Sequence, residues 1–356
     1  MSPAIESIVS ESGFALNLAP PTIAPSAVWV VTNGASGNER QALALAQALG
    51  SQPQVLRIDL RAPWSWFAPR LTAAAGLAFS ATTRKRMHAP WPALAIGCGR
   101  ESALMTRWLR RASAGATFTV QILDPRIAAT HFDVVVAPRH DGLQGGNVIQ
   151  TLGALNHVDD AWLAEGLAQF PRLQQLPQPR TAVLLGGPHR GLGLDEQWLA
   201  TLLARVAEMT ARDGGSVMMT CSRRTPDAWR ARVRGLLAAG CMHYWIDERD
   251  GINPYQGYLA AADRIVVTPD SVNMLSEACA TGKPVLSLLP PGTSSKLARF
   301  HSALASEGRV HTLDNNVDIS TISRIAPLRE LNDVVKQIRA RMQSSQANTA
   351  LAASAG

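Results

Sequence analysis

The sequence contains few cysteines and no long apolar run. Its four cysteines are far apart and form no C-x-x-C pair, so neither a zinc site nor a disulfide framework is indicated. We interpret them as small buried residues of a reducing compartment. No stretch reaches the roughly 20 apolar residues that a membrane-spanning helix needs, so the sequence predicts no span. The cysteines are Cys98, Cys221, Cys241 and Cys279.

The N-terminal residues also lack the features of a secretory signal. They have no basic n-region, and their short apolar runs are interrupted by Glu6, Glu11 and prolines. We therefore expect residues 1–26 to form a loose tail, and we expect the protein to be soluble and cytoplasmic.

Positive charge is concentrated in one segment. The chain has 34 Lys and Arg against 27 Asp and Glu, a net charge of +7, and residues 61–111 hold nine of the basic residues against a single acid, Glu101. Apolar and aromatic residues interleave with this charge, and no nucleic-acid-binding module is present. This composition is typical of a peripheral patch on an anionic bilayer, here the inner face of the cytoplasmic membrane. A buried aromatic core with a solvated basic face is the alternative. The membrane patch would comprise Trp64, Trp66, Phe67, Arg70, Arg84, Lys85 and Arg86.

Short apolar runs alternate with helical stretches along the whole chain. Because these runs are apolar throughout rather than alternating, they are typical of parallel strands covered on both faces. The sequence therefore predicts an α/β protein with two doubly wound, Rossmann-like domains. The predicted strands are residues 27–32, 54–59, 93–98, 117–122 and 133–137 in the first domain, and 181–187, 216–220, 243–246, 264–268 and 284–289 in the second.

Proline-rich and amphipathic segments suggest the domain limits. The stretch "QFPRLQQLPQPR" (169–180) interrupts the pattern before a fresh strand and is interpreted as a linker. Residues 27–168 and 181–327 are then the two domains. Residues 328–343 place Leu328, Leu331, Val335, Ile338 and Met342 on one helical stripe, which predicts a C-terminal amphipathic helix. Residues 344–356 offer nothing comparable to bury, and we expect them to be disordered.

Ligands of doubly wound sheets bind where strands end and helices begin, and two such loops in the first domain are rich in glycine. "TNGASGNERQALALAQALG" (32–50) contains a turn that leads into a helix, for which Asn38 is a candidate cap. Backbone amides at such a turn suit an anion or a closely approaching substrate, and a simple tight turn is the alternative. "GCGRES" (97–102) repeats the pattern. The candidate binding residues are Asn33, Gly34, Gly37 and Arg100.

A third loop of the first domain carries His140 and Asp141 directly after a predicted strand. A histidine beside an aspartate can serve as a general base toward a hydroxyl group, or it can satisfy local backbone groups. We name both residues as catalytic candidates.

The second domain repeats the arrangement at three strand ends. Gly186 and Gly187 follow one strand, and Ser222, Arg223 and Arg224 follow the next, where guanidinium groups can pair with phosphate oxygens. The stretch "VTPDSVNMLSEACATGKPV" (267–285) passes from a strand into a helix whose first amides can meet a phosphate. A carboxylate one to two turns into that helix can accept the hydroxyl groups of a ribose. The candidate residues of this stretch are Thr268, Asp270, Ser271, Asn273 and Glu277.

This last stretch resembles the donor domain of GT-B glycosyltransferases, including the enzymes that transfer N-acetylglucosamine to lipid-linked peptidoglycan precursors. The chain as a whole is more similar to the mitochondrial-fission-protein-like family of bacteria and plants, through "TNGASGNERQALALAQALG", "DPRIAATHFDVVVAPRHDGLQGGNVIQTLGALN", "SRRTP", "NPYQGYLAAADRIVVTPDSVNMLSEA" and "TGKPV" in this order. The resemblance covers nearly all of residues 27–312.

The resemblance implies a GT-B-like fold, with two domains that face a cleft, and a glycosyltransferase that uses a nucleotide-sugar donor. The donor would lie on the second domain, and a membrane-associated or lipid-linked acceptor would face residues 33–37 and the pair His140 and Asp141, one of which would be the base. The sequence contains no Asp-x-Asp, so the resemblance implies a reaction without a metal ion and without any cofactor beyond the donor.

Two other functions stay open. The chain can be a non-catalytic protein that keeps the fold and uses the basic patch to bind a membrane or a partner. It can also be a nucleotide-sugar epimerase of the related two-domain fold, which would use the same donor residues without an acceptor.

Overall fold

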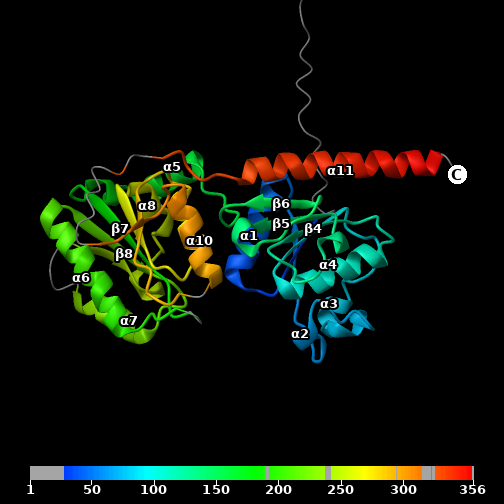
Figure 1. Cartoon of the computed structure of the whole chain (residues 1–356), viewed down its shortest axis with the longest axis horizontal. Coiled ribbons are helices and arrows are strands. Elements are labelled where there is room, and N and C mark those ends of the chain that lie inside the picture. Colours follow the sequence, from blue (N-terminus) through cyan, green and yellow to red (C-terminus); the bar gives the residue numbers. More distant parts are fainter. Residues whose placement is uncertain are drawn as a thin grey trace, which may run out of the picture.

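The structure is a computed structural model that describes residues 28–189, 192–236, 242–293, 295–314, 322 and 325–354 (Figure 1). The tail predicted for residues 1–26 and the last two residues lie outside the described residues.

Two six-stranded, fully parallel sheets organise the described chain, in the order β2-β1-β3-β4-β5-β6 and β12-β11-β10-β7-β8-β9. The predicted α/β class with two doubly wound domains is confirmed. The first sheet comprises β1 (Val28–Thr32), β2 (Gln54–Arg57), β3 (Leu94–Cys98), β4 (Phe118–Ile122), β5 (Val134–Pro138) and β6 (Val148–Thr151). The second comprises β7 (Arg180–Leu185), β8 (Ser216–Cys221), β9 (Met242–Trp245), β10 (Arg264–Val267), β11 (Val285–Ser287) and β12 (His311–Thr312).

The sequence missed one strand in each sheet, β6 and β12. Each of them is an edge strand of its sheet. An edge strand pairs on one side only and is less completely covered, so it does not need the continuous apolar run by which the central strands were recognised. In β6, Ile149 and Thr151 are buried, whereas Gln150 is exposed.

The helices of the first domain position its loops. The central helices are α1 (Ser36–Ala48) and α4 (Arg100–Ala112). An insertion between β2 and β3 contains α2 (Trp64–Phe67), η2 (Ala75–Ala78) and α3 (Ala81–Arg84), and the single turns η3 (Ala129–His131) and η4 (Arg139–Asp141) flank β5. The prediction that Asn38 caps α1 was wrong, because the helix begins at Ser36 and no side chain caps it.

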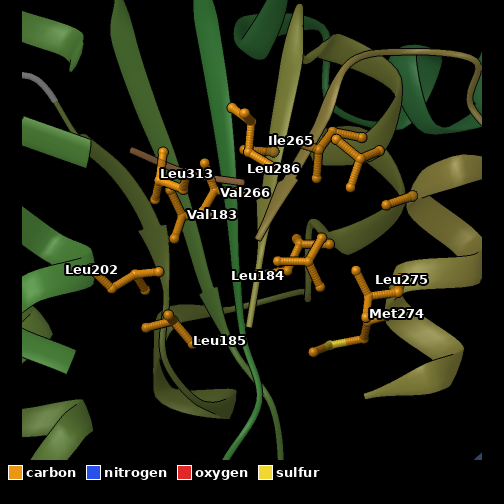
Figure 2. Close-up of a cluster of buried hydrophobic side chains, with 14 of the residues drawn as sticks. Val183, Leu184, Leu185, Leu202, Ile265, Val266, Met274, Leu275, Leu286 and Leu313 are labelled. Atoms are coloured by element: carbon orange, nitrogen blue, oxygen red, sulfur yellow. The ribbon is translucent and has the colours of Figure 1, made fainter. Parts of the chain in front are cut away.

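The helices of the second domain cover a larger core. They are α5 (Asp160–Gln169), η5 (Pro171–Gln175), α6 (Glu196–Asp213), α7 (Asp227–Leu236), η7 (Glu248–Asp250), α8 (Tyr255–Ala261), α9 (Val272–Cys279) and α10 (Ser295–Ser306). Figure 2 shows this core, in which Leu184 and Val266 of the central strands and Leu275 of α9 are completely buried. The loops at the ends of these strands therefore start from a rigid base.

The chain passes between the two sheets earlier than expected. Trp162 and Leu163 of α5 pack against the second core, and Gln256 of α8 donates a hydrogen bond to the carbonyl of Trp162 at 2.7 Å. The crossing therefore lies between β6 and α5, and residues 169–180, interpreted as the linker, follow it and lie against the second domain.

The last helix, α11 (Leu331–Ser354), returns to the first domain and runs along its outer side (Figure 1). Val334, Val335, Ile338 and Met342 join the first core. The helix begins three residues later than predicted and includes residues 344–354, which we expected to be disordered. Its entry is held by Glu330, whose carboxylate accepts hydrogen bonds from the amides of Leu152 at 2.8 Å and Gly153 at 3.0 Å.

None of the helices in the described part of the chain combines the length and the apolar character that crossing a bilayer requires.

Replacement of Ile338 by alanine tests the packing of α11. The side chain is completely buried in the first core, so Ile338→Ala should lower the free energy of unfolding by about 2 to 5 kcal/mol in urea titrations. Gln337→Ala, on the exposed side of the same turn, should change it by less than about 0.5 kcal/mol. Equal effects would contradict this packing.

Candidate functional site

A cleft of about 1130 Å³ opens between the two domains. Its walls come from the start of α1 in the first domain and, in the second, from the last residue of β7, the loops after β8 and β9 and the start of α9. These are carboxyl ends of strands, where ligands of doubly wound sheets bind. The predicted site residues that line the cleft are Gly37, Ser222, Arg223, Arg224, Ser271 and Asn273.

The first-domain loop makes a tight turn and then meets α9. The amide of Gly34 (φ +80°) donates to the hydroxyl of Thr32 at 3.1 Å, and Asn33 accepts from the amide of Ala35. A Cβ on Gly37 would lie 2.1 Å from the side-chain nitrogen of Asn273. Any larger residue at position 37 would therefore displace the side-chain amide of Asn273, so glycine permits the close approach of the two domains there.

Glu277 lies behind this contact, where it is 5% exposed. Its carboxylate accepts a hydrogen bond from the hydroxyl of Tyr255 and pairs at 3.4 Å with Arg40 from the first domain. Burial, followed by the Glu277 charge, raises the pKa of Tyr255 well above its ordinary value, so Tyr255 stays a proton donor. Beside this pair, Gln41 donates to Asn273 at 3.2 Å. The carboxylate proposed for ribose is thus shared between the two domains.

Asp270 joins the strand ends of the second domain. Its buried carboxylate accepts hydrogen bonds from the hydroxyl of Thr268 at 2.6 Å and the amide of Gly187 at 3.2 Å, and it pairs with Arg224 at 2.6 Å. The amide of Gly186 donates to Thr268 at 2.7 Å. Both glycine amides therefore have partners, and they do not face the cleft as free phosphate donors.

Arg223 faces the cleft without a close ion pair to a carboxylate among the described residues, although its charge acts on Glu39 across the cleft. It is exposed, whereas Ser222 beside it bonds locally to Thr225. On α9, the hydroxyl of Ser271 accepts from the amide of Met274 at 3.3 Å and caps the helix. The guanidinium of Arg223 and the first amides of α9 therefore line the same wall, which suits an anion.

Arg100 does not reach the cleft. Its guanidinium donates to the backbone carbonyls of Ser65, Trp66 and Ala68 at 3.1 to 3.3 Å, at the end of α2. The repeated glycine pattern suggested a shared substrate site, but Arg100 leaves α4 on the side of the insertion. The prediction that Arg100 belongs to the substrate-binding residues is therefore corrected.

His140 and Asp141 are also outside the cleft lining. They lie on η4 and contact α10, where Asp141 pairs with Lys296 at 2.7 Å and Arg299 donates to the carbonyl of His140. Asp141 is 1% exposed at its side chain, and the His140 ring packs 4.9 Å from Phe300. The structure therefore places the predicted catalytic pair in a closed contact between the domains, without access for an acceptor.

Several cleft residues were missed from the sequence. Arg40 and Gln41 stood in the quoted first loop but were not named as binding candidates, and Tyr255 precedes the donor stretch. Glu39 also lines the cleft. Its hydrogen bond from Arg57, 2.7 Å away, lowers the pKa of this carboxyl. Only the arrangement of the domains in space reveals these contacts. Among the described residues, no cluster of His, Cys, Asp or Glu has the arrangement of a metal site.

Sequence comparisons agree with the resemblance noted above. A family model described as "Mitochondrial fission ELM1" matches residues 36–342. The chain is 31% identical over 277 residues to the mitochondrial fission protein ELM1 of Arabidopsis thaliana, and the match covers 70% of this chain and 63% of the plant protein. It is 23% identical to an uncharacterized protein of Rickettsia prowazekii (strain Madrid E), covering 88% of this chain and 97% of that protein.

Solved structures show the fold. The UDP-GlcNAc 2-epimerase of Methanocaldococcus jannaschii aligns with a TM-score of 0.59 and 11% identity, covering 87% of this chain and 99% of the epimerase. A putative UDP-N-acetylglucosamine 2-epimerase of Listeria monocytogenes aligns with a TM-score of 0.53 and 11% identity, covering 90% and 97%. The described chain has the GT-B-like arrangement of two Rossmann-like domains around a cleft.

The closed contact at His140 predicts a dependence of stability on pH. Burial above all lowers the pKa of His140 below its ordinary 6.5. The unfolded chain therefore binds this proton more readily, and stability should be lost as the pH falls below about 6.5. In His140→Asn, the free energy of unfolding should decline less between about pH 7.5 and about pH 5 than in the unmodified protein.

The matched control is His88→Asn, at an exposed position, which should leave the slope unchanged. An unchanged slope in His140→Asn would show that this histidine is not held neutral.

Proposed function

Because this chain belongs to the mitochondrial fission ELM1 family and has a GT-B-like fold, we propose that it is a glycosyltransferase that uses a nucleotide-sugar donor without a metal ion. The observation that carries the proposal is the interdomain cleft, where the guanidinium of Arg223 and a capped helix start face the open space, and where the lining residues Arg40 and Tyr255 both contact the buried carboxylate of Glu277. Its volume of about 1130 Å³ suffices for a nucleotide sugar.

The donor would bind mainly to the second domain. Arg223 and the first amides of α9 would hold the diphosphate, whose negative charge increases as the sugar leaves. The hydroxyl groups of the ribose would donate to Glu277. Because the Arg40 side chain is about half exposed (48%), it can move aside or turn toward the phosphates when the ribose arrives. The nucleotide-sugar names of the two epimerases support this donor class.

A base on the acceptor side would come from the first domain. Glu39 lines the cleft, and the hydrogen bond from Arg57 lowers the pKa of its carboxyl, so a ligand that displaces Arg57 would make this carboxylate a stronger base. An ionised carboxylate near the start of α1 can accept the proton of an acceptor hydroxyl. We therefore propose Glu39 for this role in place of His140 and Asp141.

Donor binding can be tested by thermal shift with UDP, GDP, ADP, CMP and their sugars. A ligand at about 100 times its dissociation constant should stabilise the protein by about 2.7 kcal/mol, which is a shift of several degrees. Arg223→Ala and Glu277→Gln should each lose most of that shift, because they remove the phosphate and the ribose contact.

The control is Arg172→Ala, which removes an exposed arginine of η5 outside the cleft and should keep the full shift. If no nucleotide stabilises the protein, the glycosyltransferase proposal fails and a non-catalytic interaction protein is favoured. If a nucleotide sugar binds and is epimerised without an acceptor, the epimerase alternative is favoured.

A membrane-associated acceptor is supported by the insertion between β2 and β3. Trp66, Phe67 and Leu77 are 69%, 58% and 55% exposed there. In contrast, Trp64 is partly buried, and its indole N–H donates a hydrogen bond to the carbonyl of Ala73. Trp64 therefore stabilises the insertion itself. The basic residues Arg70, Arg84, Lys85 and Arg86 are exposed and have no carboxylate partner among the described residues. We propose that this surface binds anionic lipid.

Vesicle sedimentation tests the patch. Replacing Arg84, Lys85 and Arg86 by glutamine in one triple variant should weaken partitioning onto anionic vesicles by about 3 kcal/mol, or roughly a hundredfold. Binding should also fall steeply with salt.

A control variant removes the same amount of charge elsewhere. It replaces three exposed residues, Arg172, Arg232 and Lys336, by glutamine. It should retain binding. Equal binding of the unmodified protein to neutral and anionic vesicles would overturn the membrane assignment and leave donor binding untouched.

A further inference from the structure

Two adjoining hollows lie beside the last turns of α4, outside the interdomain cleft. Their volumes are about 290 and 350 Å³, and both are lined by Arg107 and Arg111. The first is completed by Thr72 and Ala75 of the insertion, and the second by His131 of η3. Two guanidinium groups therefore stand between the hollows and face both of them.

The positive charge of these hollows is not compensated. Arg110 pairs with Asp133 at 3.0 Å, and Asp133 also accepts from Thr119. Arg107 and Arg111 have no carboxylate partner among the described residues, and Arg111 makes only a long contact, 3.4 Å, to the hydroxyl of Thr72. At least two positive charges are thus free to meet an anion.

Arg107 is also incompletely satisfied. One terminal nitrogen donates to the carbonyl of Pro69 at 3.2 Å, whereas its buried Nε has no hydrogen-bond partner. Arginines near the end of a helix are favoured by the helix dipole. The dipole does not explain a buried N–H without an acceptor, which costs free energy. A bound oxyanion would supply that acceptor.

The pKa of His131 is sensitive to the same positive charges. Burial, and then the charges of Arg107, Arg111 and Arg110, lower the pKa of this histidine. A neutral imidazole still donates one N–H, and a nearby anion would favour its protonated form. The hollow therefore offers two guanidinium groups and an imidazole as hydrogen-bond donors. The nearby carboxylate, Asp133, is already paired with Arg110.

We propose that Arg107, Arg111 and His131 form a binding site for a phosphate monoester group, separate from the nucleotide-sugar cleft. A phosphate monoester carries close to two negative charges at neutral pH, and guanidinium groups bind its oxygens in pairs. The group can belong to a small soluble molecule or to the headgroup of a lipid, because the hollow adjoins the insertion that exposes Trp66 and Phe67.

The first test is calorimetric titration of the full chain with glycerol 3-phosphate, with glycerol as the neutral control. Arg111→Ala should bind the phosphate at least about tenfold more weakly, because a charged hydrogen-bonding pair is lost. Arg111 is exposed, and its guanidinium makes a long hydrogen bond to Thr72, so the substitution should have little effect on folding. Arg107→Lys, which keeps the charge but loses the fork, should also weaken binding.

The matched control is Arg172→Ala, an exposed arginine outside both hollows, which should bind normally. Arg223→Ala should bind glycerol 3-phosphate normally but lose nucleotide sugars, and Arg111→Ala should do the reverse, so the two sites are tested independently. In NMR titrations, glycerol 3-phosphate should raise the pKa of His131.

Vesicles distinguish the two sources of phosphate. Vesicles with phosphatidic acid carry phosphate monoesters, whereas vesicles with phosphatidylserine, adjusted to equal negative charge, do not. A preference for phosphatidic acid that Arg111→Ala abolishes identifies a lipid headgroup, and binding of glycerol 3-phosphate without that preference identifies a soluble ligand. If the unmodified protein binds neither, or if Arg111→Ala and Arg107→Lys bind as it does, the site does not exist.

Discussion

The wall that the second domain contributes to the cleft depends on the buried carboxylate of Asp270. This carboxylate receives the hydroxyl of Thr268, the amide of Gly187 and the guanidinium of Arg224, so the loops after β7, β8 and β10 meet at one side chain. A charge buried without such partners is strongly destabilising. The loops can converge only because Gly186 has no Cβ, which would lie 2.1 Å from that carboxylate. The wall is therefore preorganised before any ligand arrives.

The two domains touch on both sides of the cleft, with different consequences. On the η4 side, Asp141 and Lys296 form a closed contact against α10. On the α1 side, the guanidinium of Arg40 is about half exposed and pairs with the buried carboxylate of Glu277, which also accepts a hydrogen bond from Tyr255. Because Glu277 is buried, loss of the Arg40 guanidinium without a replacement would be costly. In the proposed function, the ribose hydroxyl groups would replace Arg40 at Glu277, so donor binding and this contact between the domains would compete.

The sequence predicted the central strands and the loops that follow them, because buried parallel strands are apolar throughout. It missed β6 and β12, where that requirement is relaxed. For the site, local pattern placed Ser222, Arg223 and Asn273 correctly at the cleft. It did not distinguish loops that face the cleft from loops that face elsewhere, as with Arg100 and His140. That distinction depends on the direction in which each side chain leaves its element and on how the domains are docked, which no local pattern encodes.

The path of α11 has a consequence for the order in which the chain folds. The core of the first domain includes Val334, Ile338 and Met342, which follow the whole second sheet in the sequence. During synthesis from the N-terminus, the domain that is begun first therefore lacks part of its core until the second has been made. Contacts over such separations slow folding and prolong the exposure of apolar surface. The first domain should depend on chaperones for longer than the second, although its own strands leave the ribosome earlier.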